Sequence, residues 1–131
     1  MKIADVMTLC PYTAPGDTTV PKALEIMRLR KIRHLPIVKD GELIGVLSER
    51  DAQLSQYVCQ TTQHCPSVVD LCQTDLHVVQ EDAPLESVAN EMATRKIDCT
   101  IIADKGGNVT GIFTSTDACR AIGLLLGKRK G

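Results

Sequence analysis

Two short segments of the sequence place a hydroxyl side chain three residues before an aspartate, behind a glycine and two apolar residues. They read GVLSERD, from Gly45 to Asp51, and GIFTSTD, from Gly111 to Asp117. At the start of a helix such a pair can form a capping box, in which each side chain accepts a hydrogen bond from a free backbone amide. The same groups can hold a ligand, because a helix N-terminus favours phosphate and a carboxylate accepts hydrogen bonds from ribose hydroxyls. A single copy of the motif favours the cap.

The elements that must position these motifs are repeated as well. The segments IADVM and VVDLC are centred on Asp5 and Asp70, 65 residues apart. Thr18 or Thr19 is the expected N-cap of a helix that follows the first segment, and Asp82 that of a helix after the second. Both helices are predicted from apolar residues with i, i+3, i+4, i+7 spacing, at Val20, Ala23, Leu24 and Met27 and again at Leu85, Val88, Ala89 and Met92.

Each of these helices leads into two strands and a last helix. The strands are predicted from short apolar runs separated by polar turns that contain glycine. The motif glycine is expected to keep the approach to the hydroxyl open. In the first copy the strands span 32–38 and 43–47 and the helix 49–58; in the second the strands span 97–103 and 109–113 and the helix 115–126.

The repeat predicts an α/β fold of two tandem β-α-β-β-α units. The first spans residues 1–58 and the second 68–131, joined by a polar linker at 59–67. One unit alone would leave its sheet half covered. We therefore expect the two units to pack about a pseudo-twofold axis and to share one core.

Composition limits the possible functions. The chain has 131 residues and a formal net charge of -1, with one Phe, two Tyr and no Trp. It therefore has no long-range field to attract nucleic acid or anionic lipid, and few rings to stack on bases. A basic run at 127–131 is interpreted as a solvated end. The sequence has no span of about 18 apolar residues and no signal peptide, so we expect a cytoplasmic protein without a membrane partner.

The motifs and their order resemble the cystathionine-β-synthase (CBS) domain family. The resemblance rests on DVM near the start, IRHLPIV before a glycine turn and the closing GVLSERD, and it covers nearly the whole chain as a tandem pair, or Bateman module. It is looser in the second copy, where TII replaces LPI. The resemblance implies a regulatory module, not an enzyme, that requires no cofactor and binds AMP, ADP, ATP or S-adenosylmethionine between the units. It also implies a homodimer that acts on a regulated partner, whose identity the sequence does not reveal.

The resemblance also implies which residues contact the ligand. In each site the aspartate would hold the ribose, the hydroxyl would lie near ribose or phosphate, and the start of a strand would enclose the adenine. Tyr12 and His77, near the first strand of each copy, would wall the adenine. The first site would comprise Tyr12, Ile32, Arg33, His34, Val46, Ser48 and Asp51, and the second His77, Ile97, Asp98, Cys99, Ile112, Thr114 and Asp117.

The two sites differ in charge. Arg33 and His34 give the first site cations for a polyphosphate, whereas the second has Asp98 and Cys99 at those positions. We therefore expect a charged nucleotide to prefer the first site. His34 has no nucleophile arranged around it that would make it a catalytic base.

Two other functions stay open. CQTTQHC, from Cys59 to Cys65, brings two thiols close to His64 and permits a metal or redox switch, although its spacing is wide for zinc. The six cysteines show no CxxC pair, so we expect reduced, partly buried thiols. The apolar run AIGLLLG, from Ala121 to Gly127, permits a ligand-free module that survives as a dimerisation surface.

Overall fold

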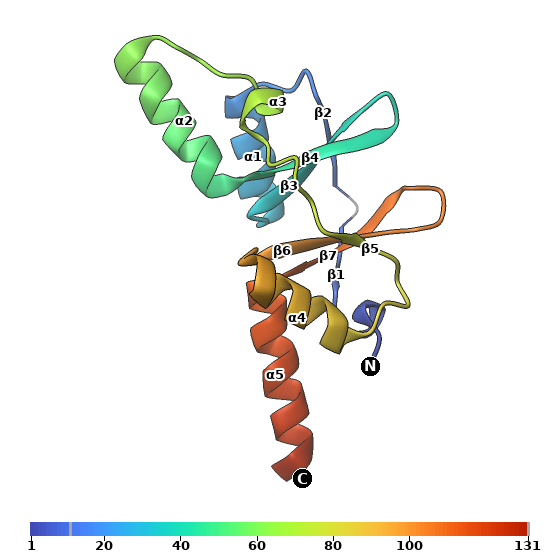
Figure 1. The fold of residues 1–131 in the computed structure, drawn as a ribbon. Coiled ribbons are helices and arrows are strands. Elements are labelled where there is room, and N and C mark those ends of the chain that lie inside the picture. Colours follow the sequence, from blue (N-terminus) through green and yellow to red (C-terminus); the bar gives the residue numbers. More distant parts are fainter. Residues whose placement is uncertain (11, 131) are drawn as a thin grey trace. The chain divides into compact units, whose positions relative to one another are not determined.

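Two small sheets, each with its own helices, make up the chain (Figure 1). The computed structural model describes residues 1–10 and 12–130, with side chains as far as residue 127, so most of the basic run at 127–131 lies outside the described side chains. Residues 12–76 form one compact unit, and residues 1–11 form the other together with 77–131. The predicted α/β class is confirmed. The units do not follow the expected repeat boundaries of 1–58, 59–67 and 68–131.

In the unit of residues 12–76, the strand order is β2-β3-β4. The β3–β4 hairpin turns at Asp40 and Gly41, both with positive φ, as a two-residue hairpin turn requires. The core combines one face of the sheet with α1 and α2, and includes Met27, Leu35 and Leu47. The elements are β2 (Ala14–Pro15), α1 (Val20–Arg30), β3 (His34–Lys39), β4 (Glu42–Ser48), α2 (Glu49–Thr62) and α3 (Val68–Leu71).

The other unit has the strand order β1-β7-β6-β5. Its core gathers Ile3, Val88, Ile102 and Phe113 between the sheet, α4 and the first residues of the chain. The elements are η1 (Ile3–Asp5), β1 (Thr8–Leu9), β5 (Val78–Val79), α4 (Leu85–Arg95), β6 (Cys99–Ala103), β7 (Val109–Thr114) and α5 (Ser115–Lys130).

The helix starts and ends differ in part from the predictions. Thr19 caps α1, since its hydroxyl accepts a hydrogen bond from the Lys22 amide. The prediction that Asp82 caps the second helix is wrong, because α4 has Pro84 at its N-cap and no side-chain cap. The last helices are longer than the predicted 49–58 and 115–126, so α2 occupies part of the expected linker.

The repeats exchange their leading segments. We call residues 1–11 and 68–76 the lead segments. In the first, Thr8 pairs with Ile112 of β7, a strand of the second repeat. In the other, the Gln73 amide donates to the Val46 carbonyl (2.9 Å), and the Gln73 carbonyl accepts from the Val46 amide (3.0 Å). This segment therefore pairs with β4 of the first repeat. This exchange explains why residues 1–11 belong to the same unit as 77–131.

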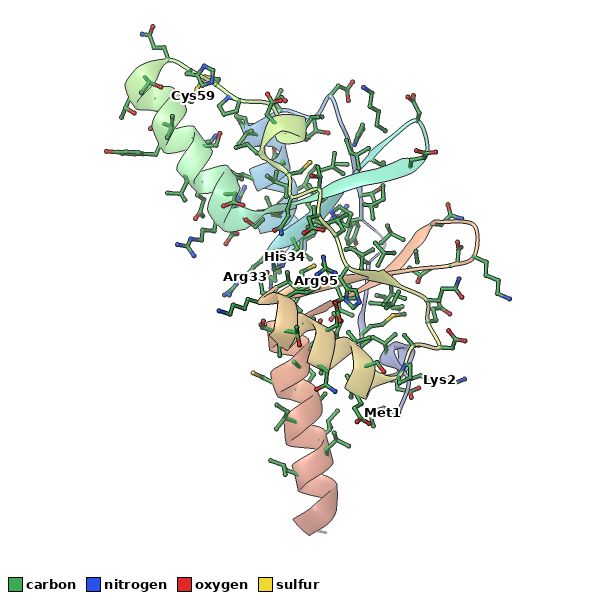
Figure 2. The ribbon with its side chains drawn as sticks, in the orientation of Figure 1. Met1, Lys2, Arg33, His34, Cys59 and Arg95 are labelled. Carbon is green, nitrogen blue, oxygen red and sulfur yellow. A yellow bond between two sulfur atoms is a disulfide. The ribbon has the colours of Figure 1, made fainter. Side chains whose placement is uncertain are left out.

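Two of the six cysteines form a disulfide, which corrects the expectation of reduced thiols. Cys59 lies in the last turn of α2 (Figure 2) and is bonded to Cys65, with their Cα atoms 4.6 Å apart. The chain turns back between them because Gln63, at the end of α2, adopts the left-handed conformation. The other four cysteines are not in disulfides: Cys10 and Cys72, which are buried, and Cys99 and Cys119.

Candidate ligand-binding site

Both motifs begin a helix, as predicted, and both hydroxyls cap it. The Ser48 hydroxyl accepts a hydrogen bond from the Asp51 amide (3.1 Å), and the Thr114 hydroxyl accepts one from the Asp117 amide (3.4 Å). These bonds satisfy one free amide in the first turn of α2 and of α5. The capping interpretation therefore holds in both copies, and the question becomes what each carboxylate does.

The strand edges predicted to enclose the adenine lie beside these helix starts. The Arg33 carbonyl accepts a hydrogen bond from the Glu49 amide at 2.8 Å. In the other unit, the Asp98 carbonyl accepts one from the Ser115 amide at 3.1 Å. In both units, therefore, the residue just before a strand, β3 or β6, is hydrogen-bonded to the first residue of the helix that follows the motif, α2 or α5. Each predicted set of site residues lies within a single unit.

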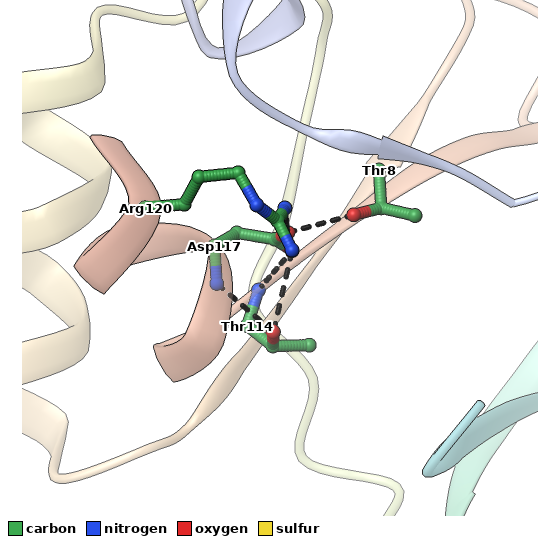
Figure 3. A network of polar contacts seen from close by, with 4 residues as sticks. All are labelled: Thr8, Thr114, Asp117 and Arg120. Carbon is green, nitrogen blue, oxygen red and sulfur yellow. Dashed lines mark hydrogen bonds and ion pairs between the residues drawn. The ribbon is translucent and has the colours of Figure 1, made fainter. Parts of the chain in front are cut away.

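The Asp117 carboxylate is buried and fully engaged (Figure 3). One oxygen accepts from the Thr8 hydroxyl at 2.7 Å and from the Arg120 guanidinium at 2.8 Å. The other accepts from the amide and the hydroxyl of Thr114, at 2.9 and 3.2 Å. Asp117 thus completes the capping box and also holds the lead segment through Thr8. A ribose could take this carboxylate only by displacing protein donors.

The Asp51 carboxylate has different neighbours. Asp51 is exposed, and among the described residues its carboxylate accepts no hydrogen bond and forms no ion pair. Leu54 stands three residues after Asp51, where Arg120 stands after Asp117, and it has no charge to pair with the carboxylate. Gln73 stands in its lead segment where Thr8 stands in the other. The capping box is therefore half formed, with the hydroxyl engaged and the carboxylate open to a ligand.

Most of the other predicted residues of the first site lie at the strand ends beside this helix start. His34 begins β3, and Arg33 directly precedes it (Figure 2). Val46 is buried in β4, Ile32 and His34 are half-buried, and Arg33 is exposed. Tyr12 precedes β2, and the Arg30 guanidinium lies 4.5 Å from the centre of its ring, a cation–π contact. The charged groups at this edge are thus largely basic.

The second site is more enclosed and less basic. His77 precedes β5, and its Nδ1 lies 2.9 Å from the Thr100 hydroxyl. Burial and the nearby Arg95 lower the pKa of His77, which favours the neutral ring. Burial, followed by the charge of Asp98, raises the pKa of the Cys99 thiol to about 12, so this thiol stays protonated. Ile112 is buried, Ile97 is half-buried, and Asp98 is exposed.

Thr8 and Arg120 were missed by the sequence predictions. Arg120 lies one helical turn after Asp117, a spacing that allows an ion pair on one helix face and could have been recognised. Thr8 could not, because it contacts Asp117 only after the lead segments are exchanged. The structure otherwise brings the predicted residues of each site to one helix start and its neighbouring strands.

In the described part of the chain, no group of three or more His, Cys, Asp and Glu side chains is arranged to hold a metal ion. Cys59 and Cys65, the proposed metal ligands, are bonded to each other. Over the same residues, no helix is both long enough and apolar enough to span a bilayer.

A sequence model of the CBS domain matches residues 3–53 and 68–124. The chain therefore belongs to the CBS domain family, and each match lies within one of the two predicted repeats, 1–58 and 68–131.

Solved structures of CBS proteins resemble the chain over most of its length. AcuB of Vibrio cholerae, described as an acetoin utilization protein, is 31% identical, with a TM-score of 0.78 over 100% of this chain and 97% of that one. A CBS domain pair crystallised with 5′-methylthioadenosine and S-adenosyl-L-methionine is 26% identical, with a TM-score of 0.81 over 94% and 96%. CBSX2, crystallised with AMP, is 26% identical, with a TM-score of 0.75 over 95% and 97%.

Curated relatives are much longer proteins. L-aspartate semialdehyde sulfurtransferase of Methanocaldococcus jannaschii is 27% identical over 122 residues, which are 92% of this chain and 23% of the relative. Inosine-5′-monophosphate dehydrogenase of Thermoplasma acidophilum is 26% identical over 106 residues, 81% of this chain and 20% of the relative. The chain thus spans about a fifth to a quarter of the length of these relatives.

Proposed function

We propose that the chain is a regulatory module that binds an adenosine-containing ligand, AMP, ADP, ATP or S-adenosylmethionine, and conveys its binding to a partner protein. The observation that carries this proposal is the open Asp51 carboxylate at the start of α2, one turn after a capping hydroxyl. A carboxylate in that place can accept hydrogen bonds from ribose hydroxyls. Membership of the CBS family and the adenosine ligands of two related structures support the same ligand class.

The first site is proposed as the higher-affinity one. Its carboxylate is available, and Arg33 and Arg30 bring positive charge to the edge of β3 and α1. In the second site a ligand must compete with Thr8 and Arg120 for Asp117. A ligand with phosphates would gain more at the basic edge, because charge-assisted hydrogen bonds are the stronger ones.

The test is isothermal titration with AMP, ATP and S-adenosylmethionine of the unmodified chain, Asp51→Ala and Asp117→Ala. We expect Asp51→Ala to lower the affinity of the tightest ligand by about tenfold or more, as the loss of hydrogen bonds to a charged group would. We expect Asp117→Ala to weaken it less. Equal losses in the two variants would contradict the order of the sites. No binding of any of the three ligands at millimolar concentration would contradict the function itself.

A second copy of the chain is the proposed first partner. The side chains of Ile122, Leu124, Leu125 and Leu126 on α5 are between 41% and 55% exposed. Neighbouring apolar side chains exposed to this degree indicate a surface that another molecule covers. The same observation favours the second candidate function, a dimerisation module without ligand, which the titrations above distinguish from the first.

A further inference from the structure

A cavity of about 490 Å³ lies in the unit of residues 12–76. Its walls are the first turn of α1 with the loop before it, one side of α2, and the segment 65–67 that precedes α3. None of the residues expected to bind an adenosine ligand lines it. Its volume falls in the range of about 300–1,000 Å³ that is typical of pockets for small organic molecules.

Ser55 of α2 marks this cavity as a binding site. It is 6% exposed and lines the cavity, and its hydroxyl has no hydrogen-bond partner among the described residues. Among the described residues, every fully buried side-chain oxygen and nitrogen has a hydrogen-bond partner. Because the Ser55 hydroxyl has none, it is not fully buried, and we infer that its accessible side faces the cavity that Ser55 lines. The Ser55 hydroxyl can therefore bond to a ligand or a water in the cavity, and a ligand that reached it without bonding would bury an unpaired polar group at a cost.

The charges of the lining restrict the ligand. No lysine, arginine or histidine lines the cavity, and Asp17 is its only charged residue. A phosphate or carboxylate would therefore meet no counter-charge. Polar groups suited to a hydroxyl or carbonyl are present in Ser55, Gln56 and Gln60, beside apolar surface from Val20 and Pro21. The N-terminus of α1 lies in the same wall and favours an oxygen acceptor.

The Cys59–Cys65 disulfide forms part of the wall. Little else in the structure holds the segment that it closes. Residues 60–65 are exposed, and Gln63 adopts a left-handed conformation that favours glycine. The Thr61 and Thr62 side chains bond to carbonyls of the preceding turn and contribute no packing. Without the crosslink the part of the wall between the end of α2 and the Ser67 cap of α3 would be free to move.

We propose that this cavity binds an uncharged organic molecule with an apolar body and a hydroxyl or carbonyl group, and that the Cys59–Cys65 disulfide holds its wall in the binding form. A dithiol would release the wall by exchange. One thiolate attacks the exposed Cys65 sulfur and displaces the Cys59 thiolate, which takes up a proton. The second thiol of the reductant then displaces Cys65 and closes its own disulfide, so two electrons and two protons pass to the protein.

The experiment compares three molecules of similar shape that differ in charge: benzyl alcohol, benzoate and benzylammonium. Each is titrated into the full chain, and binding is followed by the backbone amide resonances of Thr18, Gln56 and Gln60. We expect benzyl alcohol to shift these resonances in a saturable way and the two ions to bind at least about fivefold more weakly. Ser55→Ala should weaken benzyl alcohol about fivefold, the effect of losing one neutral hydrogen bond.

The matched control is Ser87→Ala, an exposed helical serine of α4 outside the cavity, which should leave the affinity unchanged. Dithiothreitol should weaken benzyl alcohol at least about fivefold, and the double variant Cys59→Ser/Cys65→Ser should match the reduced protein. The four other cysteines are not in disulfides, so the reductant acts on this pair alone. Amide shift dispersion confirms that each form is folded. Absence of saturable shifts, equal binding of an ion, or an affinity unaffected by reduction would overturn the proposal.

Discussion

The two motif aspartates occupy the same place at a helix start but have different neighbours. Asp117 accepts hydrogen bonds from Thr8, Thr114 and Arg120, whereas Asp51 is exposed with its carboxylate open. The difference follows from substitutions around the motif: Leu54 stands where the second copy has Arg120. One sequence pattern therefore has a structural role in one copy and a proposed ligand role in the other.

A stability measurement separates these roles. In Asp117→Asn one carboxylate oxygen becomes an amide nitrogen that donates, so it faces either the Arg120 guanidinium or the Thr114 amide, which are donors themselves, and the charge that pairs with Arg120 is lost. We expect a loss of about 1–3 kcal/mol in the free energy of unfolding by urea. The matched change Asp51→Asn removes an exposed charge from the first turn of α2 and should cost no more than about 1 kcal/mol. Equal losses would mean that the network around Asp117 contributes no net stability.

At the scale of elements, the sequence predicts the repeated order of helices and strands well. Apolar periodicity locates α1 and α4, and the glycine turns locate the two hairpins, because both signals are local. The sequence cannot predict the exchange of the lead segments. Since the repeats have similar patterns, either lead segment suits either sheet. Only the folded structure reveals that each lead segment pairs with the other repeat. The disulfide was missed because it depends on a left-handed turn at Gln63.

The exchange also gives the motif glycine a different role from the expected one. A Cβ atom on Gly45 would lie 2.9 Å from the Gln73 carbonyl oxygen and 3.1 Å from the Cys72 Cβ. A Cβ atom on Gly111 would meet the Met7 side chain of the other lead segment. The glycine therefore makes room for a lead segment, and the expectation that it clears the approach of a ligand is not needed to explain it.

We therefore expect Gly45→Ala to destabilise the protein by about 1–3 kcal/mol, the usual effect of overpacking, because backbone atoms cannot move away cheaply. Gly123→Ala is the control. Gly123 lies in α5, where an added Cβ would meet no atom within 4 Å, and the change should stabilise the helix by up to about 1 kcal/mol. Urea unfolding measures both. A neutral Gly45→Ala would contradict close packing of the lead segment against β4.

At the scale of the whole molecule, ligand binding must be coupled to something that a partner can detect. A ligand shifts an equilibrium only through its different affinities for two states. The lead segment of residues 1–11 is suited to such coupling in the second site, because Thr8 and a ligand ribose would compete for the Asp117 carboxylate. The last helix, α5, begins at that carboxylate and carries the exposed apolar residues Ile122, Leu124, Leu125 and Leu126, so one element joins the site to the proposed dimer surface.

The dimer surface can be tested directly. Ile122 and Leu126 lie one turn apart on α5 and are 55% and 51% exposed. The double variant Ile122→Lys/Leu126→Lys would place two charges in the proposed interface, where desolvation and repulsion between copies oppose association. We expect light scattering at micromolar concentration to give twice the 14.2 kDa chain mass for the unmodified protein and a monomer for the variant. Asn90→Lys/Thr94→Lys adds the same charge to exposed positions of α4 and should remain dimeric. A monomeric unmodified chain would contradict the dimer, and a dimeric α5 variant would place the interface elsewhere.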